Sequence, residues 1–381
     1  MMQNFVYYNP TKIHFGKDVH QKLGKTIQKY GQNVLLVSGQ GSIRKNGIYD
    51  ACIATLAPFN IKVHEFSGIK PNPEINDVYE AIRFGKTNKV DVVLAIGGGS
   101  VIDSAKIIAA GITSDDDVWD YFVTSKKPLH SLPLIAVITI AATSSEMNSF
   151  SVIQNKSTQQ KIGIGHSLFF PKESFMNPEF TYSVSPYQTA CGLADIIAHN
   201  LEHWFGEGDS PLTDSIIKST IHEIFEIAKP LLQNPTDYNL RARMLLASNI
   251  ALCGITAMGK TSADWGAHGI GHMLSVLYNI PHGESLAISY PAWLESVPNK
   301  EDEKMIRFAN EIMQTQNIND SITKMENFFQ SLGLRTKLNE NALNKNDSDN
   351  LLYIINKHKI NGLNYTLNDS LRTEISHLIY I

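Results

Sequence analysis

The chain has 381 residues and a mass of 42.4 kDa, with 33 basic and 37 acidic side chains and a formal net charge of −4. This balance excludes a strongly basic nucleic-acid-binding surface as the basis of function. A content of 43% hydrophobic and 18% charged residues excludes a disordered or fibrous chain. At roughly 150 residues per domain, the length predicts about two domains.

Membrane insertion and secretion are not expected. The longest apolar run, Leu132 to Ala142, contains Pro133 and is shorter than the roughly 20 residues that a membrane span needs. The N-terminal sequence MMQNFVYYNP lacks the charged and apolar blocks of a secretory signal. The three cysteines, Cys52, Cys191 and Cys253, are odd in number and widely spaced. We therefore expect reduced thiols, a cytoplasmic location and no membrane partner.

The first half of the chain alternates short β-branched runs with amphipathic segments. Strands are predicted at 33–38, 61–66, 91–96 and 133–140, and helices are predicted up to about residue 57, near 74–88 and from Ser100 onward. A β-hairpin is predicted over 151–165, with its turn near Asn155 to Thr158. The alternation predicts βαβ units and a parallel sheet that ends near residue 180.

The second half is predicted to be helical. Ser185 and Pro186 form an N-cap and first-turn pair, and long helical patterns follow with short breaks and no strand alternation. The Asn/Lys-rich stretch 337–361 is interpreted as solvated helix faces and loops. The expected organisation is an α/β domain with a parallel sheet at 1–183 and an all-α domain at 184–381.

A glycine cluster follows the strand at 91–96. Gly97, Gly98 and Gly99 lead into a helix predicted to open at Ser100, so bare backbone N–H groups and a helix N-terminus face one point, which suits an anion such as phosphate. Glycine lets a phosphate approach the backbone, and such turns often need positive φ. The alternative is merely a tight strand-to-helix turn. The motif is neither GxGxxG nor GxxxxGK[ST], so it indicates a phosphate without naming the ligand.

An earlier strand end bears on the choice of coenzyme. Gly39 stands where dinucleotide-binding proteins that use NAD place an acidic residue for the ribose 2′-hydroxyl, and Ser42, Arg44 and Lys45 follow it. The absence of that acid beside hydroxyl and basic groups favours NADP(H) over NAD(H). The alternative is that Arg44 and Lys45 are solvated helix residues.

Two segments carry metal-ligand spacing. Asp195 and His199 lie four residues apart, on one face of a predicted helix, as do His268 and His272, and His282 lies in a Pro-His-Gly turn. One carboxylate and three imidazoles from Asp195, His199, His268 and His282 suit Fe²⁺ or Zn²⁺ with a position open for a substrate oxygen. His272 would be a fourth imidazole and is interpreted as a non-ligand that faces the substrate.

A competing motif overlaps the first segment. His199, Glu202 and His203 fit H-x-x-E-H, the inverted zinc-peptidase signature with two histidine ligands and a glutamate base. That interpretation leaves Asp195 and the glycine cluster unexplained. We therefore favour the Asp195/His199 register, in which Glu202 supports the site or the fold.

Taken together, these segments resemble the iron-containing (group III) alcohol dehydrogenase family, within its NADPH-dependent aldehyde reductase and butanol dehydrogenase branch. The resemblance covers nearly the whole chain, in order and spacing. It rests on YYNPTKIHFGKD (7–18), PNPEIND (71–77), AIGGGSVIDSAK (95–106), ATSSEMN (142–148), QKIGIGHS (160–167), GLADIIAH (192–199) and GHMLS…IPHGE (271–284).

The resemblance implies a dinucleotide-binding α/β domain, a helical metal-binding domain and an active site between them. Metal ligands match Asp195, His199, His268 and His282, and the additional active-site histidine matches His272. Coenzyme positions match Gly39, Ser42, Gly98, Gly99, Ser100, Asp103, Thr139, Thr143 and Lys161. Ser144 departs from the glycine usual in the family's A-T-G-S-E segment.

The expected reaction is reversible hydride transfer between NADPH and a small aldehyde, with a divalent metal as Lewis acid and His272 as a candidate proton relay. A dehydroquinate synthase-like lyase and the zinc peptidase remain alternatives. The lyase would need a basic pocket, yet the segments 191–204 and 261–284 contain no Lys or Arg. Fe²⁺ and Zn²⁺ both suit the ligand set, and a homodimer is expected by default.

Overall fold

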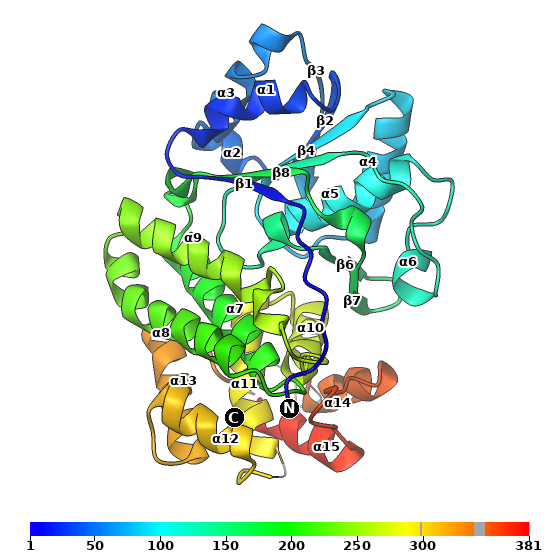
Figure 1. Ribbon diagram of the computed structural model, residues 1–381. Helices are drawn as coiled ribbons and strands as arrows, with labels where there is room; N and C mark the ends of the chain where they lie inside the picture. The colour runs from blue at the N-terminus through cyan, green and yellow to red at the C-terminus, as the bar shows by residue number, and fades with distance from the viewer. Residues whose placement is uncertain (298, 339–346, 381) are drawn as a thin grey trace. The chain divides into compact units, whose positions relative to one another are not determined.

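Figure 1 shows the computed structural model, in which residues 1–297, 299–338 and 347–380 are described. Two compact units divide these residues. The sheet unit contains residues 8–184 and 235–249, and the helical unit contains residues 1–7, 185–234 and 250–381. Helix α9 (Tyr238–Leu252) begins in the sheet unit and ends in the helical unit.

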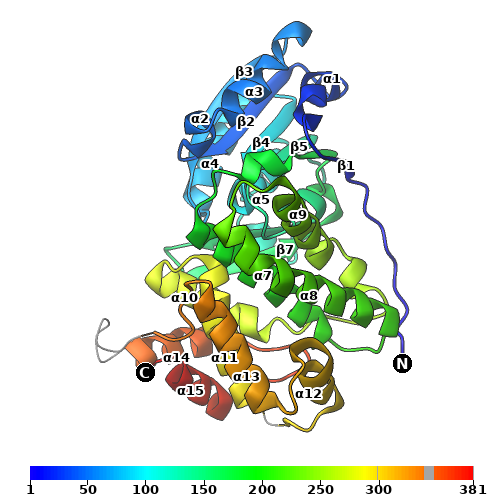
Figure 2. The same cartoon turned by 90° about the vertical axis from the view of Figure 1, so that its left-hand side faces the viewer.

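A six-stranded parallel sheet forms the centre of the sheet unit, in the order β1-β8-β5-β4-β2-β3. Its strands are β1 (Lys12–Phe15), β2 (Asn33–Gly39), β3 (Lys62–Ile69), β4 (Val92–Gly97), β5 (Leu134–Ile138) and β8 (Glu173–Met176). Figure 2 labels five of these strands, β1, β5, β4, β2 and β3. The antiparallel hairpin of β6 (Phe150–Asn155) and β7 (Gln160–Gly165) is separate from it. The predicted parallel sheet and hairpin are confirmed, and β1 and β8 are strands that the sequence analysis did not identify.

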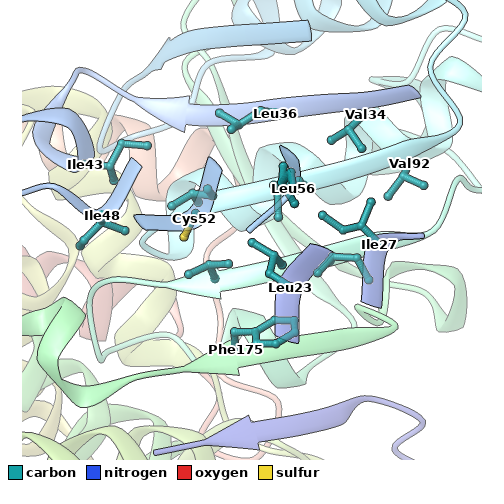
Figure 3. Close-up of a cluster of buried hydrophobic side chains, with 14 of the residues drawn as sticks. Leu23, Ile27, Val34, Leu36, Ile43, Ile48, Cys52, Leu56, Val92 and Phe175 are labelled. Atoms are coloured by element: carbon teal, nitrogen blue, oxygen red, sulfur yellow. The ribbon is translucent and has the colours of Figure 1, made fainter. Parts of the chain in front are cut away.

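Helices cover both faces of this sheet, which explains why its central strands are apolar throughout. The helices are α1 (Leu23–Ile27), α2 (Ser42–Lys45), α3 (Ile48–Ala54), α4 (Ile75–Thr87), α5 (Gly99–Ile112) and α6 (Asp120–Val123). On one face, Leu23 and Ile27 of α1 and Cys52 of α3 pack over alternate residues of β2, Val34 and Leu36 (Figure 3). On the other face, α5 packs against β4 and α4 packs against α5.

All named elements in the described part of the helical unit are helices, as predicted. They are α7 (Pro186–Trp204), α8 (Pro211–Gln233), the end of α9, a 3-10 helix (Ile255–Ala257), α10 (Gly266–Tyr278), α11 (His282–Ser296), α12 (Glu303–Arg307), a π-helical segment (Phe308–Met313), α13 (Ile318–Ser331), α14 (Asp347–Lys357) and α15 (Asp369–Leu378). The predicted cap is confirmed, because the Ser185 side chain accepts a hydrogen bond from Gln188 N and Pro186 is the first helical residue. No helix among the described residues is long and apolar enough to cross a membrane.

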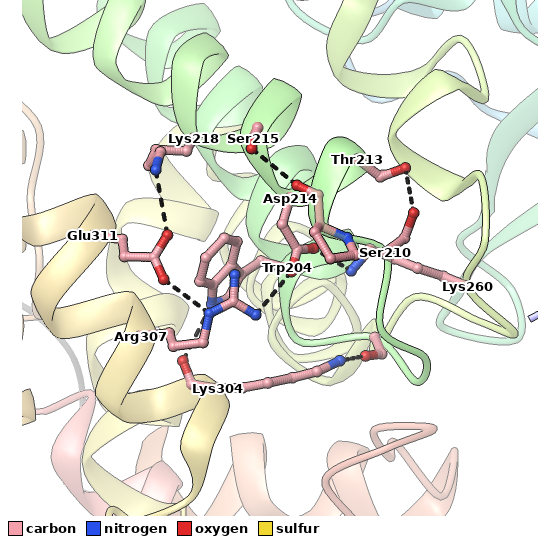
Figure 4. A network of polar contacts seen from close by, with 12 residues as sticks. Trp204, Ser210, Thr213, Asp214, Ser215, Lys218, Lys260, Lys304, Arg307 and Glu311 are labelled. Carbon is pink, nitrogen blue, oxygen red and sulfur yellow. Dashed lines mark hydrogen bonds and ion pairs between the residues drawn. The ribbon is translucent and has the colours of Figure 1, made fainter. Parts of the chain in front are cut away.

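A buried ionic network joins α8 to the segment that leads into α10 (Figure 4). Asp214 accepts hydrogen bonds from Lys260 Nζ at 2.6 Å and Arg307 Nη1 at 3.0 Å. Arg307 Nε also donates to Glu311 at 2.8 Å, and its guanidinium lies 4.9 Å from the Trp204 ring centroid. Both charges of the Asp214–Lys260 pair are therefore compensated, as buried charges require.

Two sequence predictions need a comment. His282 is the first residue of α11, with Pro281 as its N-cap, so the prediction of a turn at His282 is wrong. Proline fixes a φ that suits a helix start, and the helix continues from it to Ser296. Of the Asn/Lys-rich stretch 337–361, α14 is a helix as predicted, and residues 339–346 lie outside the described residues.

Candidate metal and coenzyme sites

Four side chains of the helical unit converge on one point. Asp195 and His199 come from α7, His268 from the first turn of α10 and His282 from the start of α11. Each offers one possible ligand atom, and these atoms all lie within 4.8 Å of one another. We call these four residues the donor group. Asp195 Oδ1 is 3.6 Å from His199 Nε2 and 3.5 Å from His282 Nε2.

The donor group fits a divalent transition metal. Asp195, His199 and His268 are buried, and His282 is partly exposed, which leaves one side of the group accessible. Burial, with the nearby His268 and His203, lowers the pKa of His199 well below its usual range, so its imidazole is in the neutral form that binds metals. One carboxylate and three imidazoles match the donor chemistry of Fe²⁺ and Zn²⁺.

Glu202 orients one member of the donor group. Its Oε1 lies 2.6 Å from His268 Nδ1 and 3.2 Å from His268 N, and Trp265 N donates to Oε2. A carboxylate on Nδ1 fixes the tautomer that leaves Nε2 as the metal-binding nitrogen. Both Glu202 carboxylate oxygens therefore accept hydrogen bonds from within the protein. Glu202 is thus not free to act as the catalytic base that the peptidase alternative requires. His203, its second histidine, lies outside the donor group.

His272 lies beside the donor group without belonging to it. Its ring centroid is 5.2 Å from that of His282 and 6.4 Å from that of His268, and the residue is partly exposed. His272 therefore lies next to the donor group, and its role as a non-ligand that faces the substrate stays a prediction.

A second clamp holds the start of α11, and the sequence analysis missed it. The buried Glu284 accepts hydrogen bonds from Tyr187 Oη at 2.7 Å and from Arg335 Nε and Nη2 at 3.1 and 2.8 Å. A Cβ added at Gly283 would lie 1.9 Å from the carbonyl oxygen of Cys191, so α11 meets α7 at a point where only glycine fits. The acid two residues after His282 was a local signal, but its partners are distant in sequence.

In the sheet unit, the glycine cluster forms a tight turn at the carboxyl end of β4. Gly98 is extended and caps α5, which begins at Gly99, one residue earlier than predicted. None of the three glycines has a positive φ. Close approach is the reason for glycine here, because a Cβ at Gly99 would lie 2.3 Å from Thr143 Oγ1 and one at Gly97 would lie 2.6 Å from Val101.

The residues assigned to the coenzyme by resemblance differ in their surroundings. Thr139 follows β5 and its N–H bonds Gly97 O at 3.0 Å, beside the glycine turn. The Asp103 carboxylate accepts hydrogen bonds from Ser145 Oγ and from Val152 N of β6, so it joins α5 to two other segments of the unit. Ser100 Oγ donates to Pro71 O.

Lys161 is buried, which its sequence did not indicate. It lies on β7, is 7% exposed and donates from Nζ to Asn72 Oδ1 at 3.1 Å. A buried ammonium needs compensation, so this lysine is not an ordinary surface residue. Asn72, 89 residues away, is a further residue that the sequence analysis missed.

Gly39 ends β2 and Ser42 begins α2, whose N-cap Gly41 has a φ of 105°. A Cβ at Gly39 would make only ordinary contacts, at 3.6 Å from Ile69 O and 3.8 Å from Val101. Arg44 is exposed on α2, forms an ion pair with Glu65 and lies over the Tyr49 ring at 3.7 Å from its centroid. Arg44 and Lys45 are thus solvated helix residues, as the alternative describes them.

Ser144, the departure from the family pattern, has a φ of 54°. Side chains rarely adopt this left-handed conformation, which accounts for a glycine at this position in the family pattern. The Ser144 hydroxyl donates to Asn249 O at 3.0 Å and Asn249 Nδ2 donates to Glu146 at 2.8 Å. The loop thus keeps its left-handed residue through contacts with α9.

A parallel-sheet unit with a glycine turn at its carboxyl edge, together with a helical unit that carries a buried Asp-His₃ group, defines a metal-dependent oxidoreductase. The chain belongs to the iron-containing alcohol dehydrogenase family. The family model described as iron-containing alcohol dehydrogenase matches residues 10–178, and that of the Fe-containing alcohol dehydrogenase family, C-terminal, matches residues 189–374. Membership implies a nicotinamide coenzyme and iron.

Individual proteins of this family are similar to the chain in sequence and in structure. The chain is 38% identical to NADH-dependent butanol dehydrogenase A of Clostridium acetobutylicum, over 90% of each chain. It is 30% identical to the NADPH-dependent aldehyde reductase YqhD of Escherichia coli, over 100% of this chain and 99% of the relative. The crystal structure of an NADH-dependent butanol dehydrogenase A from Thermotoga maritima superposes with a TM-score of 0.95 at 35% identity, over 100% of this chain and 99% of that one.

Proposed function

We propose that this protein catalyses the reversible NAD(P)H-linked reduction of small aldehydes to primary alcohols, and that the donor group holds the metal. The observation that carries the proposal is the convergence of Asp195, His199, His268 and His282 from three helices onto a space less than 4.8 Å across. Buried imidazoles that cluster in this way serve a ligand more readily than they serve packing.

The residues around the metal site would have different roles in the reaction. When bound, a divalent metal supplies Lewis-acid polarisation of the carbonyl group, and the nicotinamide supplies the hydride. Glu202 keeps the proton of His268 on Nδ1. His272 would take part in the exchange of a proton between the substrate oxygen and water, because an imidazole beside the group titrates near neutral pH when it is unperturbed.

We propose a small uncharged substrate. The segments 191–204 and 261–284, which supply the donor group, contain no Lys or Arg that could pair with an anionic substrate. This feature disfavours the lyase alternative, which acts on an anion. Butanol dehydrogenase and aldehyde reductase relatives support the same choice.

We propose NADP(H) as the preferred coenzyme. Gly39 leaves no carboxylate at the end of β2 to repel a 2′-phosphate, and Ser42 starts the next helix. The relatives divide, since butanol dehydrogenase A is named NADH-dependent and YqhD NADPH-dependent. The pairing of Arg44 with Glu65 lessens the contribution that Arg44 can make.

The coenzyme proposal is tested with Gly39→Asp, which the local packing accommodates. A carboxylate close to a 2′-phosphate costs on the order of 1–3 kcal/mol, or roughly ten- to a hundred-fold in kcat/KM for NADPH. The wild type and Gly39→Asp are assayed with both coenzymes at equal low concentration. Equal use of NADH by the wild type, or an unchanged NADPH rate in Gly39→Asp, would contradict the proposal.

The reaction and the ligands are tested together. The purified protein is assayed for metal content and for NADPH and NADH oxidation with a panel of short aldehydes. His268→Ala and His282→Ala should lose the metal and nearly all turnover, whereas His272→Ala should keep the metal and lose rate. His203→Ala is the matched control, because His203 lies one turn after His199 on α7 outside the donor group. Metal loss in His203→Ala alone would support the peptidase alternative.

We also propose iron rather than zinc, on the family description, residues 1–183 as the coenzyme-binding domain and 184–381 as the metal-binding domain. A homodimer and a cytoplasmic location complete the proposal. The exposed apolar side chains of Met2, Phe5, Val6 and Tyr8 support self-association, and three buried cysteines without a disulfide suit a reducing compartment. Light scattering of the purified protein tests the dimer.

A further inference from the structure

The carboxylate of Asp264 joins the start of α10 to a distant segment of the chain. Asp264 is 1% exposed and immediately precedes the N-cap of α10, Trp265. Its Oδ1 accepts a hydrogen bond from Gly266 N at 3.0 Å, and its Oδ2 accepts from Asn364 N at 3.0 Å and Tyr365 N at 2.7 Å. One buried side chain therefore holds the helix start and residues 362–365, which we call the strap.

The packing around this carboxylate is close on both sides. A Cβ added at Gly362 would lie 2.4 Å from Asp264 Oδ1, and one added at Gly266 would lie 2.8 Å from the same oxygen. The backbone N–H of Leu363 donates to the Asp264 carbonyl oxygen at 2.8 Å. The strap and the helix start thus meet Asp264 at distances that only glycine permits, and the carboxylate has little freedom to move.

Glu202 holds the same helix start from α7. It accepts hydrogen bonds from Trp265 N and His268 N, so the N–H groups of Trp265, Gly266 and His268 all end on two buried carboxylates. A helix leaves its first N–H groups without partners of its own, and acids at this end also stabilise the helix dipole. Trp265 has a φ of 67°, a strained conformation that persists only where its surroundings impose it.

We propose that Asp264 is a positioning residue for the metal site. By fixing the first turn of α10 it sets the place of His268, the third residue of that helix, relative to Asp195 and His199 on α7. The strap is part of the same device, because it binds the second oxygen of Asp264. The inference rests on the proposed role of His268 as a metal ligand.

Asp264→Asn tests the proposal in the full chain. An amide keeps one acceptor oxygen but turns an NH₂ group toward backbone N–H donors, so the hydrogen bonds of either the helix start or the strap are lost. We expect affinity for Co²⁺, used as the metal probe in a chelator competition, to fall ten- to a hundred-fold. We also expect a changed visible Co²⁺ spectrum, a lower kcat with coenzyme KM unchanged, and faster amide hydrogen exchange over 266–270 and 362–365.

Tyr365→Phe is the matched control. It removes the contact of the Tyr365 hydroxyl with Asp302, which is one of the other attachments of the strap, and leaves the hydrogen bonds from the strap to Asp264 in place. This variant should keep wild-type Co²⁺ affinity and spectrum. If Asp264→Asn fails to fold, Gly362→Ala is the second variant. Its methyl group pushes the strap away from the Asp264 carboxylate and leaves the acid itself unchanged. This variant should also weaken Co²⁺ binding.

Two results would overturn the inference. The first is wild-type Co²⁺ affinity and spectrum in Asp264→Asn, or in Gly362→Ala if that variant replaces it. The second is an equal loss in Tyr365→Phe, which would show general destabilisation. His268→Ala separates this failure from that of the proposed function: if His268→Ala keeps the metal, the ligand set itself is wrong, whereas metal loss there with unchanged Asp264→Asn rejects only the positioning role.

Discussion

The hydrogen bond between Glu202 and His268 makes a quantitative prediction for Glu202→Gln. The carboxylate accepts from His268 Nδ1 at 2.6 Å, from His268 N at 3.2 Å and from Trp265 N. Glutamine has the same size but only one acceptor oxygen, and its NH₂ group must face one of these donors. The substitution therefore removes at least one charge-assisted bond and allows the His268 proton to move to Nε2.

The expected loss follows from these contacts. A hydrogen bond to a charged group contributes about 1.5–3 kcal/mol. Because the bond orients a ligand, we expect that energy to appear in metal binding, as a fall of roughly ten- to a hundred-fold in affinity. Turnover at saturating metal should fall less, since the other three members of the donor group are unchanged.

Competition between the protein and a chelator for Co²⁺ or Zn²⁺ measures this affinity directly. Glu146→Gln is the control, because Glu146 is also 1% exposed and bonded, to Asn249 Nδ2, but belongs to the sheet unit. An unchanged metal affinity in Glu202→Gln would refute the reasoning. So would a fall of the same size in Glu146→Gln.

Three further predictions concern other parts of the molecule. Gly283→Ala should lower the free energy of unfolding by roughly 3 kcal/mol and remove most of the bound metal, because its methyl group would meet the carbonyl oxygen of Cys191 at 1.9 Å. Urea unfolding and metal analysis test it. Gly99→Ala should weaken coenzyme binding roughly tenfold or more and leave metal content unchanged, because its methyl group would meet Thr143 Oγ1 at 2.3 Å at the start of α5. NADPH fluorescence titration and metal analysis test it. Arg335→Leu should destabilise the metal-depleted protein by about 1–2 kcal/mol at pH 7. Although burial raises it, hydrogen bonds from Arg335 and Tyr187 bring the pKa of Glu284 below its usual value. That contribution is present above about pH 4.5 and is lost as the acid protonates at lower pH, so the stability difference between variant and wild type should narrow there; an equal difference at pH 4 and pH 7 in urea unfolding would contradict the assignment.

Much of the fold could be predicted because its signals are local. The apolar strands β2, β4 and β5 contrast with their flanks, and Ser185 before Pro186 marks the start of α7 through its own hydrogen bond. The donor group could also be proposed, since two of its members share a helical face. By contrast, β1 and β8 are short, four residues each, and become strands only by pairing with each other and with β5.

The supports of the site depend on contacts between distant residues, which no local pattern records. From the sequence, Lys161 resembles an ordinary surface lysine, and only the structure shows its hydrogen bond to Asn72. In the same way, Glu284 resembles an ordinary helix residue, and only the structure shows its bond to Arg335. His282 illustrates a conflict between two local signals. A Pro-His-Gly sequence is typical of a turn, but proline before a helix also fixes its entry, and the packing of α11 on α7 decides between them.

Because α9 begins in one unit and ends in the other, it constrains how the chain folds during synthesis and where it can be divided into fragments. Residues 235–249 belong to the sheet unit, and Asn249 bonds both Ser144 and Glu146 there. During synthesis the sheet unit therefore lacks a helix, and the buried Glu146 lacks its amide partner, until the chain has grown past residue 249. A fragment ended at 183 would carry the same defect permanently, with a buried carboxylate left without this hydrogen bond. A fragment begun at 184 would retain α9, although most of this helix, residues 238–249, belongs to the sheet unit that the fragment lacks.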